Sequence, residues 1–218
     1  MVFSYHINSG DNRIIINGDE YRHLFKARRH KINEIIPFRN LKDGYLYFYI
    51  VKSVNRKEAI LELVKSEFNE NRPKKEFHLG WCIIDFKTIL KTIPTLNEIG
   101  VTKISFIYCD RSQRNFKIDL EKLQRVLILS CMQNGRSNLM EIEILNSIND
   151  FRKYGEFTAI HFSKDNYLGD SKRVLIGAEG GFTENELNSF KDIKGLDSFI
   201  LKSETAVIVV STLTILRS

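Results

Sequence analysis

The residues best suited to ligand chemistry lie at 174–186, in the run Val-Leu-Ile-Gly-Ala-Glu-Gly-Gly-Phe-Thr-Glu-Asn-Glu. A short apolar run leads into a loop with glycines at 177, 180 and 181. Glycine lets the backbone approach a ligand closely, and free amides at a helix start attract electron-rich groups. Thr183 and Glu186 have capping-box spacing, which predicts that a helix begins directly after the loop. We therefore expect a ligand-binding loop between a strand and a helix.

This loop lacks the two best-known phosphate-binding patterns. No Gly-Lys-Ser/Thr follows it, and the Gly-x-Gly-x-x-Gly spacing of dinucleotide-binding folds is absent. Glu179 would also repel a phosphate group. The expected ligand is therefore not a simple polyphosphate. A tight strand-to-helix turn that binds nothing would show the same pattern.

Two arginines lie in polar segments that follow predicted elements. Arg111 belongs to Asp-Arg-Ser-Gln-Arg, residues 110–114, directly after a predicted strand, and Arg136 closes the next predicted helix. If the strands are parallel, residues 110–114 share a sheet edge with the glycine loop. Either guanidinium could hold a carboxylate, a phosphate or a base edge, or form a surface salt bridge. No Ser/His/Asp or Cys/His set shows a recognisable spacing, which disfavours covalent catalysis.

A basic segment lies near the start of the chain, beside two aromatic residues. Five cations fall within ten residues: Arg22, Lys26, Arg28, Arg29 and Lys31. Such density suits binding along a phosphate backbone, and the net charge of +6 at pH 7 favours polyanionic partners. A solvated helix face is the other interpretation. The two histidines nearby have no ligand partners in view, so we expect no metal there.

Composition fits a globular chain of one or two domains. The 218 residues are 43% hydrophobic and 28% charged. Cys82, Cys109 and Cys131 are odd in number and far apart, which argues against a zinc site or a disulfide framework and favours reduced thiols. No signal pattern and no apolar run of 18 residues is visible. We therefore expect a cytoplasmic protein without a membrane span.

The first third of the chain is rich in strand-forming residues. Short runs of Ile, Val, Tyr and Phe predict strands at 13–17, 34–38, 45–54 and 59–64, with a helix at 19–29. Short strands around one helix are typical of a small barrel. Residues 65–76 are the most polar dozen of the chain, so we expect a domain boundary there, between domains at 1–70 and 71–218.

Strands and helices alternate after this boundary. Strands are expected at 77–84, 103–109, 157–162, 173–176 and 197–201, and helices at 87–99, 120–134, 184–193 and 204–216. This alternation predicts an α/β domain with a mainly parallel sheet covered by helices. Pro94 should kink or end its helix. The β-branched run 207–210 is assigned to a buried helix on context alone.

Taken in order, these segments resemble a known family. The matching parts are 110–112, 125–136, 176–182 and 200–206, together with the basic segment at 21–31. They resemble the RsmE family, bacterial 16S ribosomal RNA (uracil-N3)-methyltransferases of the SPOUT superfamily. The resemblance implies a PUA-like β-barrel at 1–70 that binds RNA. It also implies a SPOUT α/β domain at 71–218 with a C-terminal trefoil knot.

The resemblance further implies S-adenosylmethionine as cofactor, a homodimer, and 16S ribosomal RNA or the small ribosomal subunit as partner. It assigns cofactor binding to three loops, at His161, Ile176, Gly177, Gly180, Gly181, Leu196, Ile200, Leu201 and Thr205. Uridine N3 carries a proton that must leave. We expect Glu179 or Glu204 to accept it, and Arg136 and Arg111 to stabilise the resulting anion or grip the RNA.

Five positions depart from the family pattern, at Thr95, Met132, Ala178, Asp197 and Lys202, and two of them support an alternative function. Asp197 stands where the family has glycine, and Met132 stands where it has glutamate. The alternative is a non-catalytic RNA-binding or ribosome-assembly protein on the same scaffold. A third hypothesis, an α/β enzyme acting on a small nucleotide, leaves the separate basic segment unexplained.

Overall fold

The computed structural model describes residues 2–112 and 117–217, so Gln113 and Arg114 of the polar segment at 110–114 lie outside the described residues. The chain divides into two compact units. The first comprises residues 1–72 together with 131–139, and the second comprises 73–130 together with 140–218.

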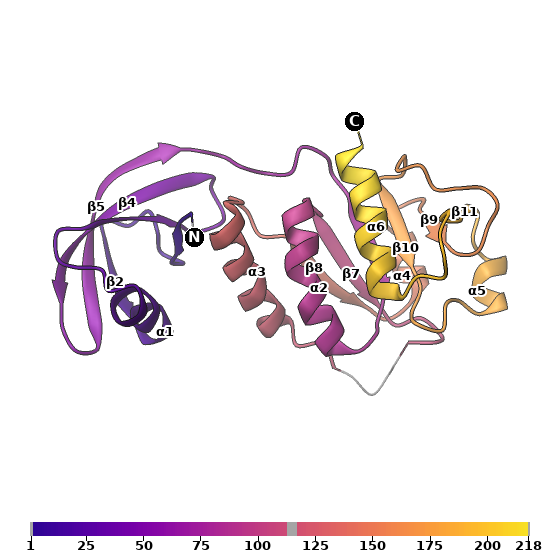
Figure 1. The fold of residues 1–218 in the computed structure, drawn as a ribbon, viewed down its shortest axis with the longest axis horizontal. Coiled ribbons are helices and arrows are strands. Elements are labelled where there is room, and N and C mark those ends of the chain that lie inside the picture. The colour runs from indigo at the N-terminus through magenta and orange to yellow at the C-terminus, as the bar shows by residue number, and fades with distance from the viewer. Residues whose placement is uncertain (1, 113–116, 218) are drawn as a thin grey trace. The chain divides into compact units, whose positions relative to one another are not determined.

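The first unit contains a five-stranded sheet that curls around a short helix (Figure 1). The strand order is β1-β3-β4-β5-β2; β1 and β3 are parallel and the other neighbours are antiparallel. The elements are β1 (Ser4–Tyr5), β2 (Arg13–Asn17), α1 (Gly18–Tyr21), a π-helical turn (Arg22–Ala27), β3 (Ile35–Arg39), β4 (Tyr45–Val54) and β5 (Glu58–Phe68).

The core of this unit explains why one helix is enough to cover the sheet. Tyr21, Leu24 and Phe25 of the helical segment pack against inward-facing strand residues such as Ile16 and Leu61. Alternation along β2, where the second and fourth residues are buried, places apolar side chains on one face only. The expected helix at 19–29 is therefore confirmed in position, but most of it is π-helical.

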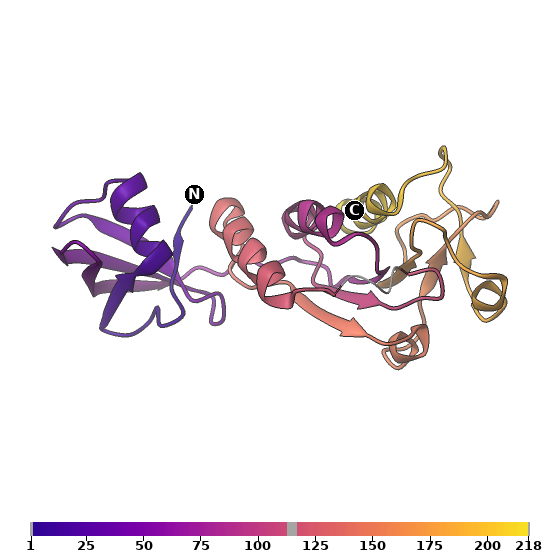
Figure 2. The same ribbon diagram turned by 90° about the horizontal axis from the view of Figure 1, so that it is seen from below.

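The second unit is a six-stranded, fully parallel sheet with helices on both faces. The strand order is β11-β9-β10-β6-β7-β8. In Figure 2, α2 and α6 lie on one face and α4 lies on the other. The elements are β6 (His78–Cys82), α2 (Phe86–Ile99), β7 (Lys103–Ile107), α3 (Leu120–Asn134), β8 (Glu141–Leu145), α4 (Ile148–Arg152), β9 (Thr158–Ile160), β10 (Arg173–Ile176), α5 (Glu184–Asn188), β11 (Ile193–Lys194) and α6 (Ser203–Leu216).

Two expectations about this unit are wrong, the strand at 197–201 and the end of the helix at 193. Residues 197–201 form no strand; Phe199 is 95% exposed, and the edge strand is β11 instead. Pro94, which was expected to kink or end its helix, does not end it: α2 runs on to Ile99, and Gly100 supplies the left-handed C-cap with φ 108°. The helix after the glycine loop ends at Asn188 rather than 193. By contrast, the β-branched run 207–210 is helical, as expected.

The cysteines form a pair that the sequence analysis did not expect. Cys82 and Cys109 are joined by a disulfide, with 5.6 Å between their Cα atoms, while Cys131 is free and buried. β6 and β7 are parallel neighbours, so residues 27 apart in sequence lie side by side at the sheet edge. Sequence spacing could not indicate this pairing, because it depends on which strands are adjacent.

Within the described parts of the chain, no helix is long and apolar enough to cross a membrane.

Candidate active site

A cavity of about 440 Å³ lies where the parallel strands of the second unit end. Three segments line most of it: 160–163 at the end of β9, 176–182 at the end of β10, and residues between 195 and 203 that lead into α6. Arg111, which follows β7, also lines it. The carboxyl edge of an open parallel sheet is where such folds bind ligands.

The glycine loop is fixed at its far end by the cap of α5. Thr183 and Glu186 form the expected capping box: the Thr183 hydroxyl accepts the Glu186 amide, and the Glu186 carboxylate accepts the Thr183 amide. The same carboxylate accepts the backbone N–H of Asp110 at 2.9 Å, and the Thr183 hydroxyl donates to the Asp110 carboxylate at 2.8 Å. The guanidinium of Arg111 donates to the carbonyl of Gly180. The segment after β7 and the glycine loop are thus bonded to each other.

His161 stands at the wall of the cavity beside two phenylalanines. Its ring centroid lies 4.9 Å from that of Phe162 and 6.2 Å from that of Phe182. Burial, and then the positive charge of Arg111, hold the pKa of His161 below its usual value. The imidazole is therefore neutral at pH 7 and can offer both a donor and an acceptor nitrogen.

The third lining segment crosses the first so closely that one position admits only glycine. The amide of Gly195 donates to the carbonyl of Asp165, and the amide of Tyr167 donates to the carbonyl of Gly195, each at 2.8 Å. A Cβ at Gly195 would collide with the carbonyl oxygen of Ser163. Two loops that are some thirty residues apart are therefore held in backbone contact at the wall of the cavity.

Comparison with known proteins identifies the family. A family model described as an RNA methyltransferase domain matches residues 70–215, and one described as an RNA methyltransferase PUA domain matches residues 16–64. The ribosomal RNA small subunit methyltransferase E of Helicobacter pylori is 39% identical, with 98% of this chain and 99% of that protein covered. The chain belongs to this family of RNA methyltransferases. A relative of the same name from Aquifex aeolicus is 26% identical over 90% of this chain and 91% of that protein.

Solved structures share the fold. A probable ribosomal RNA methyltransferase from Porphyromonas gingivalis superposes with a TM-score of 0.84 at 19% identity, covering 97% of this chain and 95% of that one. The family enzyme of Neisseria gonorrhoeae, solved bound to S-adenosyl methionine, gives 0.82 at 20% identity with the same coverage. The expected order of a curled PUA-type sheet followed by a parallel α/β RNA methyltransferase domain is confirmed, while the C-terminal trefoil knot stays a prediction.

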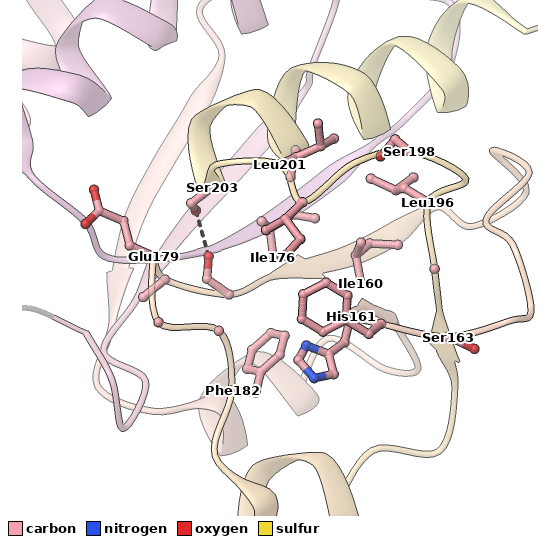
Figure 3. A pocket seen from close by; sticks show the side chains of 18 of the residues that line it. Ile160, His161, Ser163, Ile176, Glu179, Phe182, Leu196, Ser198, Leu201 and Ser203 are labelled. Carbon is pink, nitrogen blue, oxygen red and sulfur yellow. Dashed lines mark hydrogen bonds between the residues drawn. The ribbon is translucent and has the colours of Figure 1, made fainter.

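Most of the residues expected to bind a methyl donor in this methyltransferase lie around the cavity. Eight of the nine line it: His161, Ile176, Gly177, Gly180, Gly181, Leu196, Ile200 and Leu201. Thr205 does not, because it lies in the first turn of α6 with its side chain exposed. Two of the four expected catalytic residues, Arg111 and Glu179, also line the cavity. In Figure 3 the carboxylate of Glu179 points away from the ring of His161.

The other two expected catalytic residues do not line this cavity. Glu204 follows Ser203 in the first turn of α6, and its Oε2 atom is buried without a hydrogen-bond partner among the described residues. Arg136 belongs to the first unit and is 4% exposed; its Nε donates to the side chain of Asn138. Burial lowers the pKa of Arg136.

Sequence reasoning missed several lining residues. Phe182 and Ser203 were both present in the quoted motifs but received no role, and Gly195 stands just outside them. Their contribution depends on packing between distant segments. Asp197, by contrast, is exposed and does not line the cavity, so its side chain does not fill the space where a ligand would bind.

The basic segment keeps all five of its cations exposed on the first unit, at Arg22, Lys26, Arg28, Arg29 and Lys31. Arg22 pairs with Asp19, and Lys26 lies over the ring of Tyr21 at 5.5 Å. Arg29 has a left-handed backbone with φ 61°, which is uncommon for a residue with a side chain.

Proposed function

We propose that this methyltransferase transfers the methyl group of S-adenosylmethionine to N3 of a uridine in 16S ribosomal RNA of the small subunit. The observation that carries the proposal is the cavity at the carboxyl edge of the parallel sheet, built from the three segments to which the resemblance assigns cofactor binding. Close full-length similarity to ribosomal RNA small subunit methyltransferases E supports the substrate.

The cavity suits a nucleoside-sized ligand without phosphate groups. Its volume lies in the range of small-molecule sites, and four of its lining residues are glycines, which expose backbone to the cavity. Ile160, Ile176 and Leu201 provide an apolar side on which a base could pack (Figure 3). Among the described residues that line the cavity, Arg111 is the single Lys or Arg, which fits one carboxylate better than a polyphosphate.

The bound cofactor would supply an electrophilic methyl group, and the protein would supply alignment and proton transfer. The N3 proton of uridine must leave, and Glu179 or Glu204 is proposed to accept it. Arg111 and Arg136 are proposed to stabilise the charge that develops on the uracil oxygens or to grip the RNA. Arg111 is the better supported of the two because it lines the cavity.

We divide the labour between a domain at 1–70 that holds RNA and a domain at 71–218 that transfers the methyl group. The exposed cations at 22–31 would contact phosphates, and recognition would depend mainly on folded RNA shape. The crossing of Gly195 over Ser163 supports a knotted C-terminal segment. The non-catalytic alternative has lost a main support, because Asp197 leaves the cavity open.

We further propose a cytoplasmic homodimer. Phe199 and Ile200 are 95% and 82% exposed beside the cavity, and Leu168 and Leu216 are also largely exposed. Phe199 and Ile200 are adjacent in the chain, and exposed neighbouring apolar side chains favour a protein interface at that position. Light scattering should give twice the mass of the 25.4 kDa chain.

Two measurements test the activity. Isothermal titration calorimetry should show S-adenosylmethionine binding to the purified protein. Reverse transcription across 16S ribosomal RNA should stop at one uridine in wild-type cells, because N3 methylation blocks base pairing, and the stop should vanish in cells that lack the protein. Binding without loss of the stop would leave a donor-binding protein with another target; absence of binding would refute the proposal.

A further inference from the structure

A buried serine connects the chain's single tryptophan to the first glycine of the donor loop. Ser203 is the first residue of α6, is 5% exposed and lines the cavity. The indole N–H of Trp81 donates to the Ser203 hydroxyl at 2.9 Å. That hydroxyl donates to the carbonyl of Gly177 at 2.6 Å, the dashed line at Ser203 in Figure 3. All three groups lie at the carboxyl edge of the sheet, where β6 and β10 are neighbours.

The direction of both bonds follows from the groups involved. An indole N–H can only donate, so the serine oxygen must accept from Trp81. The hydroxyl has one proton, and that proton is left for the Gly177 carbonyl, which can only accept. Trp81 is fully buried, so its N–H has no access to water as a substitute partner.

This arrangement fixes the peptide plane at the start of the glycine loop. A trans peptide is planar, so holding the Gly177 carbonyl also sets the direction of the Ala178 amide. Gly177 has no side chain to restrict its backbone, and both Gly177 and Ala178 line the cavity. The cap of α5 holds the end of the loop at Thr183, and Ser203 holds its beginning, at Gly177, to α6.

We propose that Ser203 is a positioning residue for donor binding, which acts by holding the Gly177 carbonyl, and that Trp81 holds Ser203 in turn. This inference rests on the proposed function, because it assumes that the cavity binds S-adenosylmethionine. It makes Trp81 an internal reporter: all tryptophan emission of the chain comes from an indole whose hydrogen-bond partner lines the cavity.

The test compares Ser203→Ala with Ser203→Thr by calorimetry with S-adenosylmethionine and by tryptophan fluorescence. Ser203→Ala should weaken donor binding by about tenfold or more, equivalent to about 1.4 kcal/mol. It should also shift the Trp81 emission maximum before any donor is added, since the indole loses its acceptor. Ser203→Thr retains the hydroxyl and should restore both properties. Affinity for an RNA fragment should be the same in all three proteins.

Ser211→Ala is the matched control, because Ser211 is a fully buried serine of the same helix that does not line the cavity. It should leave donor affinity unchanged. Equal donor affinity in wild type and Ser203→Ala, or equal weakening in Ser211→Ala, would overturn the inference while wild-type binding upheld the proposed function. A wild-type protein that does not bind the donor would overturn both.

Discussion

Glu186 shows how one side chain can organise a site without lining it. Its carboxylate is largely buried and accepts two backbone amides, from Thr183 at 2.8 Å and from Asp110 at 2.9 Å. The first bond fixes the end of the glycine loop, and the second holds the segment that carries Arg111. A carboxylate suits this position because it offers two acceptor oxygens and no donor.

We therefore expect Glu186→Gln to lower the free energy of unfolding of the second unit by about 1–3 kcal/mol, since the amide NH2 would face one of the two backbone N–H donors. Thermal denaturation followed by circular dichroism would measure the change. Glu184→Gln, at an exposed glutamate two residues earlier in α5, is the control and should have little effect. Equal midpoints for the two variants would contradict this account.

At the scale of elements, the sequence predicted those whose signals are local. The capping box, the glycine C-cap of α2 and the strand 173–176 all depend on residues next to each other, and all are confirmed. β8 was missed although its sequence, Glu-Ile-Glu-Ile-Leu, has the apolar/polar alternation of a half-buried edge strand. The Cys82–Cys109 bond and the Trp81–Ser203 contact were missed because their partners are 27 and 122 residues apart.

A polar group spans the three strands at one side of the second sheet. His78 of β6 shares a hydrogen bond with Ser105 of β7, whose hydroxyl donates to Glu143 of β8. Lys103 forms an ion pair with the Glu143 carboxylate, and the Tyr154 hydroxyl donates a hydrogen bond to it. Burial, and then the charge of Lys103, lower the pKa of His78 to about 4, although Glu143 opposes them.

This shift gives the fold a defined response to acid. An unfolded histidine titrates near 6.5, so the folded state resists protonation between about pH 6.5 and about pH 4. The stabilising contribution is complete above pH 6.5 and is lost as the pH falls through this window, on the order of 1–2 kcal/mol between pH 7 and pH 5. Titration of the His78 ring followed by NMR should give a midpoint near pH 4.

The control is His78→Gln, which can still donate to Ser105 but has no proton to gain. Unfolding free energy should fall less between pH 7 and pH 5 in this variant than in the wild type. The variant is needed because Glu20 affects the same measurement in the opposite direction. Burial raises the pKa of Glu20 to about 7, so its contribution to the free energy of unfolding increases as the pH falls. A His78 midpoint near 6.5 would show that the imidazole is not desolvated.

At the scale of the whole molecule, the exposed basic segment and the cavity belong to different units of the chain. The first unit exposes five cations within ten residues, while Arg111 is the one Lys or Arg among the described residues that line the cavity of the second unit. Phosphate contacts give binding that weakens with salt, because each one releases condensed counterions. A cavity with few charged side chains in its wall gives binding that depends less on salt. RNA binding and donor binding should therefore respond differently to the same substitutions.

We expect Arg28→Ala combined with Arg29→Ala to weaken binding of a labelled 16S ribosomal RNA fragment by roughly tenfold. The slope of log K against log salt should fall by about 1–2, since up to two phosphate contacts are lost. Fluorescence anisotropy at several salt concentrations measures both quantities. Calorimetry with S-adenosylmethionine should give the wild-type affinity, because neither arginine belongs to the unit that contains the cavity.

A second double variant, with the same loss of charge at another place, tests whether RNA affinity depends on the position of the cations or only on the net charge. Lys87 and Lys91 are both exposed on α2, so changing the two of them to alanine removes the same charge from the second unit. If RNA is held by the basic segment at 22–31, this control should keep most of the RNA affinity and most of the salt slope. Equal weakening by both double variants would mean that RNA responds to overall charge alone. Loss of donor binding in the Arg28 and Arg29 double variant would refute the division of labour between the two units.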